Sequence, residues 1–314
     1  MNQIIITGAT GSIGQRLVKE LNAKGKKVII FTRNTENAQK KLPNTVKYVK
    51  WDYKNPEEWK DQLNGVDTVI HLAGANLSSK RWNEEFKKLA YDSRVLSTRN
   101  LVEAISSIKQ KPKAFICASA VGYYGNRYDE ILSEESLPGD DYMANLCKDW
   151  EAEAAKVEQY GVRRVSVRTG LVLSKDEGVL KQLLLPFKLF VGGPLGNGRQ
   201  WFPWIHIDDI VGIYLQAIDN ESLNGEVNAS SPGIVGMTEF AKTFGKVLHR
   251  PSLFKIPKFA MKIVAGEVAD YAVMSQRISV DKMLNAGYKF KFTDLENSLK
   301  NIMNKKVNDN YLIN

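Results

Sequence analysis

The sequence predicts an α/β fold in which a doubly wound parallel sheet carries a smaller C-terminal cap. Short runs rich in Val and Ile alternate with longer amphipathic stretches through the first half of the chain, which is the pattern of βαβ units around a sheet buried on both faces. A glycine-rich turn follows the first of these runs. After about residue 170 the alternation stops, and Gly and Pro separate shorter helical pieces.

The elements follow in chain order. The expected strands are residues 3–7, 27–32, 46–50, 68–72, 114–118 and 164–168. The expected helices are residues 12–23, 35–41, 57–63, 84–108, 143–159 and 207–218. Because connections between parallel strands are almost always right-handed, the helices should cover both faces of the sheet. We therefore expect a sheet domain over residues 1–170, to which 207–229 returns, and a cap formed by 171–206 and 230–314.

The composition is that of an ordinary globular protein with a basic surface. Of the 314 residues, 43% are hydrophobic and 25% charged, which excludes a disordered or fibrous chain. Lys and Arg number 44 and Asp and Glu 35, so the formal net charge is +9. The basic stretches 40–41, 109–113 and 305–306 are scattered, which favours solvated faces over a nucleic-acid site.

The cysteine count and the N-terminus predict a cytoplasmic protein. Cys117 and Cys147 are too few for a disulfide framework and suit a reducing compartment. No basic segment followed by an apolar one opens the chain, and no uncharged apolar stretch approaches the ~18 residues of a membrane span. We expect a small-molecule substrate and no nucleic-acid or membrane partner; a homodimer is left open.

The glycine-rich turn predicts a phosphate-binding site. Residues 7–14 read TGATGSIG between an expected strand and an expected helix, the context that a dinucleotide fingerprint requires. Gly8 would permit the tight turn, Gly11 the approach of a pyrophosphate, and Gly14 the packing of helix on strand. The first N–H groups of the helix would bind the anion. The alternative is an ordinary strand–helix turn. The expected contact residues are Gly8, Thr10, Gly11, Ser12, Ile13 and Gly14.

The end of the second strand indicates which dinucleotide is bound. Residues 31–34 read FTRN. An NAD enzyme usually has an acidic residue here for the ribose 2′-hydroxyl, whereas an Arg nearby suits the 2′-phosphate of NADP. Thr32 and Arg33 are therefore candidate cofactor residues, and the guanidinium of Arg33 could hold a phosphate with two hydrogen bonds. The alternative is a solvated Arg. We predict NADP(H) in preference to NAD(H).

The glycine spacing, Gly-x-x-Gly-x-x-Gly, resembles that of the short-chain dehydrogenase/reductase superfamily. The resemblance implies that Asp52, after the third strand, lies against the adenine. It also implies that residues 71–75, HLAGA, form a turn beside the ribose and nicotinamide. Leu72, Ala73 and Gly74 are the candidate residues of that turn, and His71 is given no chemical role.

Further segments resemble the extended members of this superfamily, the nucleotide-sugar epimerases and dehydratases. They are CASAVGYYG at 117–125 and GNGRQWFPWIHIDD at 196–209. With DWE at 149–151 and SQR at 275–277 followed by Lys282, they are similar to an atypical subgroup usually labelled "epimerase family protein", which ends in a small domain of unknown function. The resemblance covers essentially the whole chain and implies a Rossmann fold, but it names no substrate.

The usual acid–base pair of the superfamily is missing. Its members use Tyr-x-x-x-Lys on a helix, because a spacing of four puts both side chains on one face and the Lys charge lowers the phenol pKa. None of the 12 tyrosines here has Lys four residues later. Aligned on Glu151, the chain has Met143 in the Tyr position and Cys147 in the Lys position.

Four residues are candidates for the missing chemistry. Tyr123 and Tyr124 follow the fifth strand near the expected nicotinamide, and Ser119 could orient a carbonyl there. Tyr142 could act only if it precedes the helix. The alternative is that the tyrosines at this strand end serve packing.

A loop in the expected cap supplies candidate substrate residues. Arg199, Trp204 and His206 lie in a segment whose position resembles the loop that closes the pocket of extended members, and Arg199 could hold an anionic group. The alternative is a loop anchored by its tryptophans. The three histidines and two cysteines have no metal-ligand spacing, so no metal is expected.

Two functions follow from these patterns. The first is an NADP(H)-dependent oxidoreductase or epimerase of atypical mechanism that acts on a small polar substrate. The second is a non-catalytic NADP(H)-binding redox sensor or scaffold, which the missing pair suggests. A polar cavity beside the nicotinamide would favour the enzyme, and a blocked or apolar one the sensor.

Overall fold

A seven-stranded parallel sheet organises the computed structural model, which describes residues 3–175 and 177–304. The strand order is β11-β7-β5-β4-β1-β2-β3, and every neighbouring pair is parallel. The strands are β1 (Gln3–Thr7), β2 (Lys27–Thr32), β3 (Lys47–Lys50), β4 (Thr68–His71), β5 (Ala114–Ala120), β7 (Arg163–Thr169) and β11 (Gly225–Ala229). This order confirms the predicted doubly wound α/β fold.

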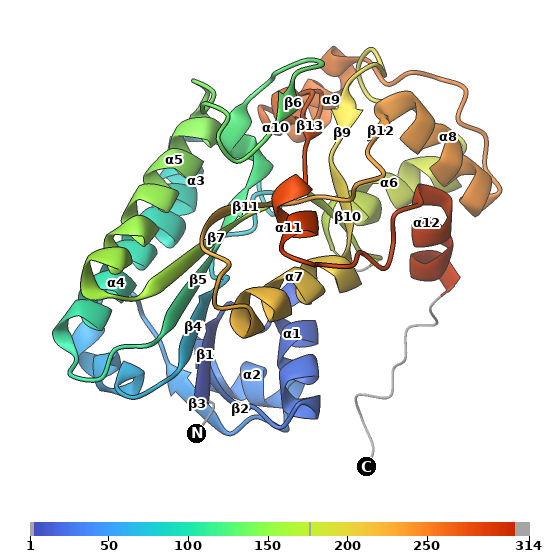
Figure 1. Cartoon of the computed structure of the whole chain (residues 1–314). Helices are drawn as coiled ribbons and strands as arrows, with labels where there is room; N and C mark the ends of the chain where they lie inside the picture. The colour runs from blue at the N-terminus through green and yellow to red at the C-terminus, as the bar shows by residue number, and fades with distance from the viewer. Residues whose placement is uncertain (1–2, 176, 305–314) are drawn as a thin grey trace.

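Helices cover both faces of the sheet, and its strands are accordingly apolar on both sides. α1 (Ser12–Ala23) and α7 (Ile207–Asp219) lie on one face, and α4 (Ser97–Ser107) and α5 (Tyr142–Ala155) lie on the other (Figure 1). In β1, Ile4 and Ile6 belong to one hydrophobic core and Ile5 to the other, and all three are at most 2% exposed. Alternate side chains of one strand therefore stabilise two layers.

The expected helix 84–108 is interrupted. It consists of α3 (Glu84–Tyr91), a π-helical turn (Asp92–Leu96) and α4. A π-helical turn closes its hydrogen bonds over five residues instead of four, so it inserts one extra residue and rotates the side chains around it.

The remaining expected helices of the sheet domain form with small differences. α1 and α2 (Thr35–Lys41) have the expected bounds, and α5 begins at Tyr142, one residue earlier than expected. The expected helix 57–63 is two short 3-10 turns, Pro56–Glu58 and Lys60–Leu63.

The seventh strand, β11, was not among the expected strands. Its sequence GEVNA contains the polar residues Glu226 and Asn228 and no apolar run. It lies at an edge of the sheet and pairs with β7. Gly225 pairs with Val165, which lies 60 residues earlier in the chain. This pairing, rather than local hydrophobicity, makes the segment a strand.

Residues of the expected cap form a hydrophobic core separate from the two cores of the sheet. Trp204, Phe240 and Phe244 are fully buried in it, and α6, α8 and α12 lie on the side of the sheet away from α4 and α5 (Figure 1). The elements of the expected cap are β8 (Leu171–Leu173), α6 (Gly178–Lys188), β9 (Trp201–Phe202), β10 (Trp204–His206), β12 (Val235–Gly236), α8 (Met237–Leu248), α9 (Lys258–Ala265), α10 (Val268–Tyr271), β13 (Arg277–Ile278), α11 (Asp281–Asn285) and α12 (Leu295–Asn304). Residues 305–314 of the expected cap, with the basic stretch 305–306, lie outside the described residues.

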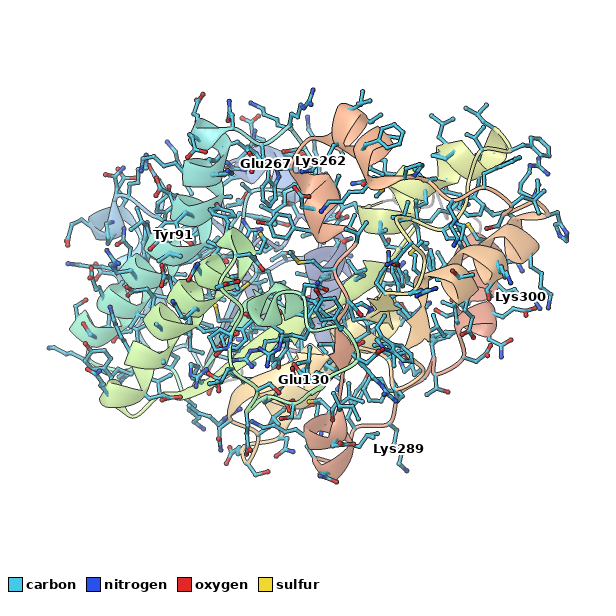
Figure 2. The ribbon with its side chains drawn as sticks, turned by 90° about the horizontal axis from the view of Figure 1, so that it is seen from above. Tyr91, Glu130, Lys262, Glu267, Lys289 and Lys300 are labelled. Carbon is cyan, nitrogen blue, oxygen red and sulfur yellow. The ribbon has the colours of Figure 1, made fainter. Side chains whose placement is uncertain are left out.

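The cap and the sheet domain contact each other through α3 and through a small strand pair. Glu267 beside α10, labelled in Figure 2, forms an ion pair with Lys87 of α3 at 2.7 Å. β6 (Ile131–Leu132), in the segment after β5, pairs with β13. Among the described residues, no helix has both the length and the apolar character needed to cross a bilayer.

Candidate functional site

A cleft opens at the carboxyl ends of the strands, where β1 lies between β2 and β4. The strand order reverses at this point, and ligands of open α/β sheets bind at such a reversal. The cleft has a volume of about 920 Å³ and runs from Arg33 past the glycine turn and residues 72–77 to Ser119. One cavity therefore reaches the ends of β2, β1, β4 and β5.

The glycine turn forms the floor of this cleft. Gly8 has φ +69°, and a Cβ on it would lie 2.6 Å from the carbonyl carbon of Leu72. A Cβ on Gly14 would lie 2.6 Å from the Cα of Ala9, so helix α1 packs directly on the turn. A Cβ on Gly11 would have its nearest neighbour at 3.5 Å, so the space beside this residue is open to a ligand. The lining residues of the turn are Gly8, Thr10, Gly11, Ser12, Ile13 and Gly14.

The N-terminus of α1 already holds a negative group. Gly11 is its N-cap and supplies no capping side chain. The backbone N–H of Ser12 instead donates to the Glu177 carboxylate, at 3.3 Å. A carboxylate oxygen stands here where a phosphate oxygen would bind, which is the anion preference of a helix N-terminus.

Arg33 lies at the end of the cleft next to β2. Thr32, Arg33 and Asn34 line this end, and the Arg33 side chain is exposed. Asn34 is occupied as the N-cap of α2, where it accepts a hydrogen bond from the Asn37 N–H at 2.8 Å. The charged group at this end of the lining is therefore a guanidinium, which suits a phosphate.

Asp52 lies outside the lining of the cleft. Its carboxylate accepts hydrogen bonds from the Lys54 N–H at 3.0 Å and the Asn55 amide at 3.1 Å, within its own loop. Its neighbours Trp51 and Tyr53 line the cleft instead.

His71 fastens the turn after β4 to β1. Its Nδ1 lies 2.7 Å from Thr7 Oγ1 and its Nε2 3.0 Å from Ser97 Oγ. Because Ser97 donates to the carbonyl of Ser93, it accepts from Nε2–H, and Thr7 then donates to Nδ1. Thr7 Oγ1 in turn accepts from the Ala73 N–H at 3.2 Å. Burial lowers the His71 pKa from 6.5 to about 3, so the ring stays neutral and holds residues 72–74 at the cleft.

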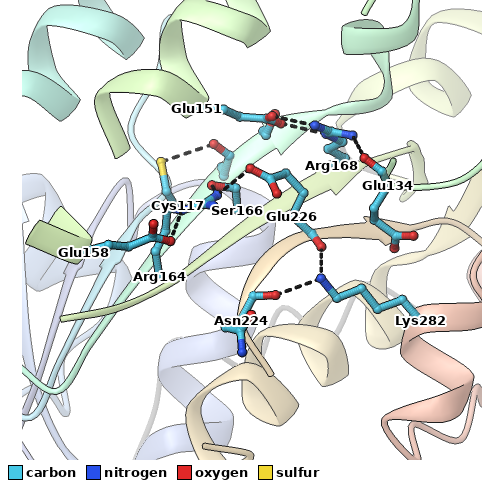
Figure 3. Close-up of polar contacts among 12 residues, drawn as sticks. Cys117, Glu134, Glu151, Glu158, Arg164, Ser166, Arg168, Asn224, Glu226 and Lys282 are labelled. Carbon is cyan, nitrogen blue, oxygen red and sulfur yellow. Dashed lines mark hydrogen bonds and ion pairs between the residues drawn. The ribbon is translucent and has the colours of Figure 1, made fainter. Parts of the chain in front are cut away.

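A buried ion pair lies at the end of β5. Ser119 Oγ, which lines the cleft, donates to Glu151 Oε1 at 2.5 Å. Arg168 of β7 donates from Nε to Oε1 at 2.9 Å and from Nη2 to Oε2 at 2.8 Å (Figure 3). Glu151 and Arg168 are 6% and 2% exposed, so the pair is nearly sealed from solvent.

Three of the four candidate residues lie outside the cleft lining. Tyr124 is fully buried, donates to Asn228 Oδ1 at 2.7 Å and accepts from Arg168 Nη1 at 3.0 Å. Burial raises its pKa to about 12. The Tyr123 ring covers the Arg168 guanidinium, 3.6 Å from ring centre to Cζ. Tyr142 is the first residue of α5 and donates to the Lys87 carbonyl at 2.7 Å. Ser119 is the candidate that reaches the cavity.

The two positions at which the sequence was expected to lack the usual acid–base pair carry sulfur side chains. Met143 and Cys147 both line it. Burial raises the pKa of the Cys147 thiol to about 12, so the thiol stays protonated and is a poor nucleophile.

The predicted substrate loop does not line the cleft. Trp204 is fully buried and donates from Nε1 to the Gly233 carbonyl at 2.8 Å. His206 is also buried, caps α7 by accepting from the Asp208 N–H at 3.0 Å, and stacks on Phe292. Arg199 is exposed and is not a lining residue. In residues 3–175 and 177–304, no three His, Cys, Asp or Glu side chains are grouped as a metal site.

Sequence reasoning missed the charged residues at the inner end of the cleft. Glu151 was used only to align the chain with the superfamily motif, although it lies four residues after Cys147 and therefore on the same helical face. Arg168 could have been noticed as a charged residue in the Val-rich run of β7, where a buried charge needs a partner. Arg94, which also lines the cleft, carries no local signal within the expected helix 84–108.

Two protein-family models match the chain. Residues 4–229 match the NAD dependent epimerase/dehydratase family, and residues 256–302 match a domain of unknown function, DUF1731. The Arabidopsis thaliana protein "Epimerase family protein SDR39U1 homolog, chloroplastic" is 36% identical over 302 residues, which cover 96% of this chain and 86% of that protein. The Bacillus subtilis epimerase family protein YfhF is 35% identical over 303 residues, 96% of this chain and 97% of that protein.

Solved structures are similar over the same span. The crystal structure of human epimerase family protein SDR39U1 (isoform 2) with NADPH has a TM-score of 0.87 and 33% identity, covering 97% of this chain and 100% of that one. A nucleoside-diphosphate sugar epimerase from Corynebacterium glutamicum has a TM-score of 0.75 and 33% identity, covering 95% of this chain and 57% of that one.

Proposed function

The chain belongs to the NAD-dependent epimerase/dehydratase family, and from this membership we propose that it is an NADP(H)-dependent oxidoreductase or epimerase acting on a small polar substrate. The observation that carries the proposal is the continuity of the cleft, which has Arg33 at one end and Ser119 at the other. The human relative, solved with NADPH, supports the choice of cofactor.

The residues along the cleft fit NADP(H). The N–H groups at the start of α1, one of which already holds the Glu177 carboxylate, would bind the pyrophosphate. Arg33 would pair with the 2′-phosphate. Leu72, Ala73 and Gly74, fastened through Thr7 and His71, would lie along the nicotinamide half. When bound, the cofactor supplies a hydride acceptor or donor.

Ser119 is our candidate for the residue that touches substrate. Its hydroxyl proton is committed to Glu151, so its oxygen is left as an acceptor for a substrate hydroxyl. Arg168 donates hydrogen bonds to both oxygens of Glu151, which orients the carboxylate toward Ser119. A substrate that carries a hydroxyl group matches this arrangement.

One observation favours the second function, a non-catalytic NADP(H)-binding sensor or scaffold. Met143 and Cys147 line the cleft at the two positions of the usual acid–base pair, and neither exchanges a proton at neutral pH. The two functions share the cofactor and differ only in turnover.

Two measurements test the proposal. Titration should give a lower Kd for NADPH than for NADH. Arg33→Ala should remove most of that preference, because the loss of a charged contact should raise the Kd of NADPH by roughly tenfold or more. Lys41→Ala, at the far end of α2, is the matched control. Equal affinities for the two cofactors in the unmodified chain would disprove the NADP preference.

Turnover is tested by a screen of carbonyl compounds and nucleotide sugars. The absorbance of the reduced nicotinamide and the stereochemistry of the product are followed in the unmodified chain and in Ser119→Ala. The enzyme is supported by turnover that Ser119→Ala lowers by about tenfold or more. Turnover that persists in Ser119→Ala excludes Ser119, and binding of NADPH without turnover of any substrate class supports the sensor.

A further inference from the structure

The π-helical turn between α3 and α4 aims two neighbouring side chains at the turn after β4. Ser93 Oγ accepts from the Ala75 N–H at 3.0 Å, and Arg94 Nη2 donates to the Ala75 carbonyl at 3.0 Å. Both residues line the cleft. Because π-helical turns rotate the side chains that follow them and are frequent at functional sites, the position of Arg94 is one that a regular helix would not provide.

The guanidinium of Arg94 lies between the turn after β4 and helix α5. It packs against Gly74, where a Cβ would meet its Cζ at 3.0 Å. It also lies over the ring of Trp150, 5.5 Å from the ring centre. Its charge acts on the Cys147 thiol. Arg94 and Cys147 both line the cleft, so the guanidinium charge acts at the position where the superfamily motif has its Lys.

Arg94, which is half-buried, differs from the buried arginines Arg168 and Arg164 in its partners. Arg168 is paired with Glu151 and Arg164 with Glu158 and Glu226. The hydrogen bonds of Arg94 within the described residues go to the carbonyls of Ala90 and Ala75, and no carboxylate pairs with it there. Burial lowers its pKa, so the charged form is less favourable here than it would be in water.

We propose that Arg94 supplies the cation of the missing Lys, by donating hydrogen bonds to the nicotinamide ribose of bound NADPH. Two of its five N–H groups are used by the two carbonyls, which leaves others for the hydroxyl oxygens of the ribose. The same charge stabilises negative charge on a substrate oxygen near Ser119. The role rests on the proposed binding of NADPH in this cleft.

The test compares a whole cofactor with its adenosine half. Calorimetric titration measures the Kd of NADPH and of adenosine 2′,5′-bisphosphate, which lacks the nicotinamide ribose, for the unmodified chain, Arg94→Gln and Arg94→Lys. Arg94→Gln should raise the Kd of NADPH by roughly tenfold or more and leave the Kd of the bisphosphate unchanged. Arg94→Lys, which keeps the charge, should have an NADPH Kd between those of the unmodified chain and of Arg94→Gln. Arg99→Gln, which removes an α4 cation paired with Glu153 at 2.8 Å, is the control and should change neither.

A rescue separates binding of the ribose from support of the turn. In the double variant Arg94→Gln/Cys147→Lys, the new Lys occupies the motif position, and NADPH affinity should recover while the melting temperature confirms folding. Unchanged NADPH affinity in Arg94→Gln, equal weakening of both ligands, or a folded double variant without recovery would overturn the role of Arg94. Failure of the unmodified chain to bind either ligand would instead disprove the proposed cofactor.

Discussion

Arg168 reaches both oxygens of Glu151, at 2.9 and 2.8 Å, from the neighbouring strand end, and both side chains are nearly sealed from solvent. The pair joins β7 to α5, and through Ser119 it also reaches the end of β5. Three separate elements thus converge on one carboxylate. A bidentate pair in this setting is well oriented, but its loss leaves a buried charge unpaired.

Glu151→Gln should lower the free energy of unfolding by roughly 3–5 kcal/mol, because the Arg168 guanidinium loses its counter-charge while it remains buried. Urea denaturation followed by circular dichroism measures the change. Glu130→Gln, which breaks the exposed pair with Arg127 (Glu130 is labelled in Figure 2), is the control and should leave the midpoint nearly unchanged. Equal effects of the two variants would contradict the importance of the buried pair.

Gly14→Ala and Gly11→Ala should separate folding from ligand binding. A Cβ on Gly14 meets the Ala9 backbone at 2.6 Å, so this variant should lose about 1–3 kcal/mol of stability. A Cβ on Gly11 has its nearest neighbour at 3.5 Å and projects into the open cleft, so Gly11→Ala should keep its stability. It should bind NADPH roughly tenfold more weakly. Thermal melting and NADPH titration check both. Full NADPH affinity in Gly11→Ala would show that no pyrophosphate approaches this turn.

His71 should make the fold sensitive to mild acid. Its pKa is about 3 in the native protein and 6.5 in the free imidazole, so between these values the unfolded chain takes up a proton that the native chain does not. Stability therefore falls as the pH drops below about 6.5, by up to about 1.4 kcal/mol per unit from this group. His71→Gln should show a shallower decrease in denaturation midpoint between pH 6.5 and about 4.

The control for this experiment is the exposed His249, which has φ +53° and is therefore replaced by Asn, a residue that tolerates that conformation. His249→Asn should keep the slope of the unmodified chain. A slope in His71→Gln equal to that of the unmodified chain would mean that His71 takes up its proton in the native state.

Glu177→Gln should tighten NADPH binding by about threefold to tenfold, because the Glu177 carboxylate accepts from the Ser12 N–H at the start of α1 and would repel a pyrophosphate there. Titration at low and high salt measures the gain, which should shrink as salt screens the repulsion. Glu20→Gln, near the other end of α1, is the control. Weaker binding in Glu177→Gln would indicate that the carboxylate supports the cofactor site.

The elements that sequence patterns predict well are those whose signal is local. β1 and β2 have the expected bounds, and the hydrophobic run of each is complete within itself. α1 follows from the amphipathic pattern after the glycine turn. β11 escapes such prediction because its residues are polar and only pairing with β7 makes it a strand. The π-helical turn that divides the expected helix 84–108 likewise accompanies tertiary contacts, the hydrogen bonds of Ser93 and Arg94 with the backbone of Ala75.

The doubly wound sheet, the family and the glycine turn can be read from the order of the residues, because periodicity, spacing and backbone freedom are properties of neighbours along the chain. Which side chains share the inner end of the cleft is settled only by folding. Ser119, Glu151 and Arg168 come from three separate elements, and Arg94, which lines the same cleft, comes from a fourth. A buried charge is stable only beside a partner, and contacts that no local pattern encodes determine which partner each charge meets.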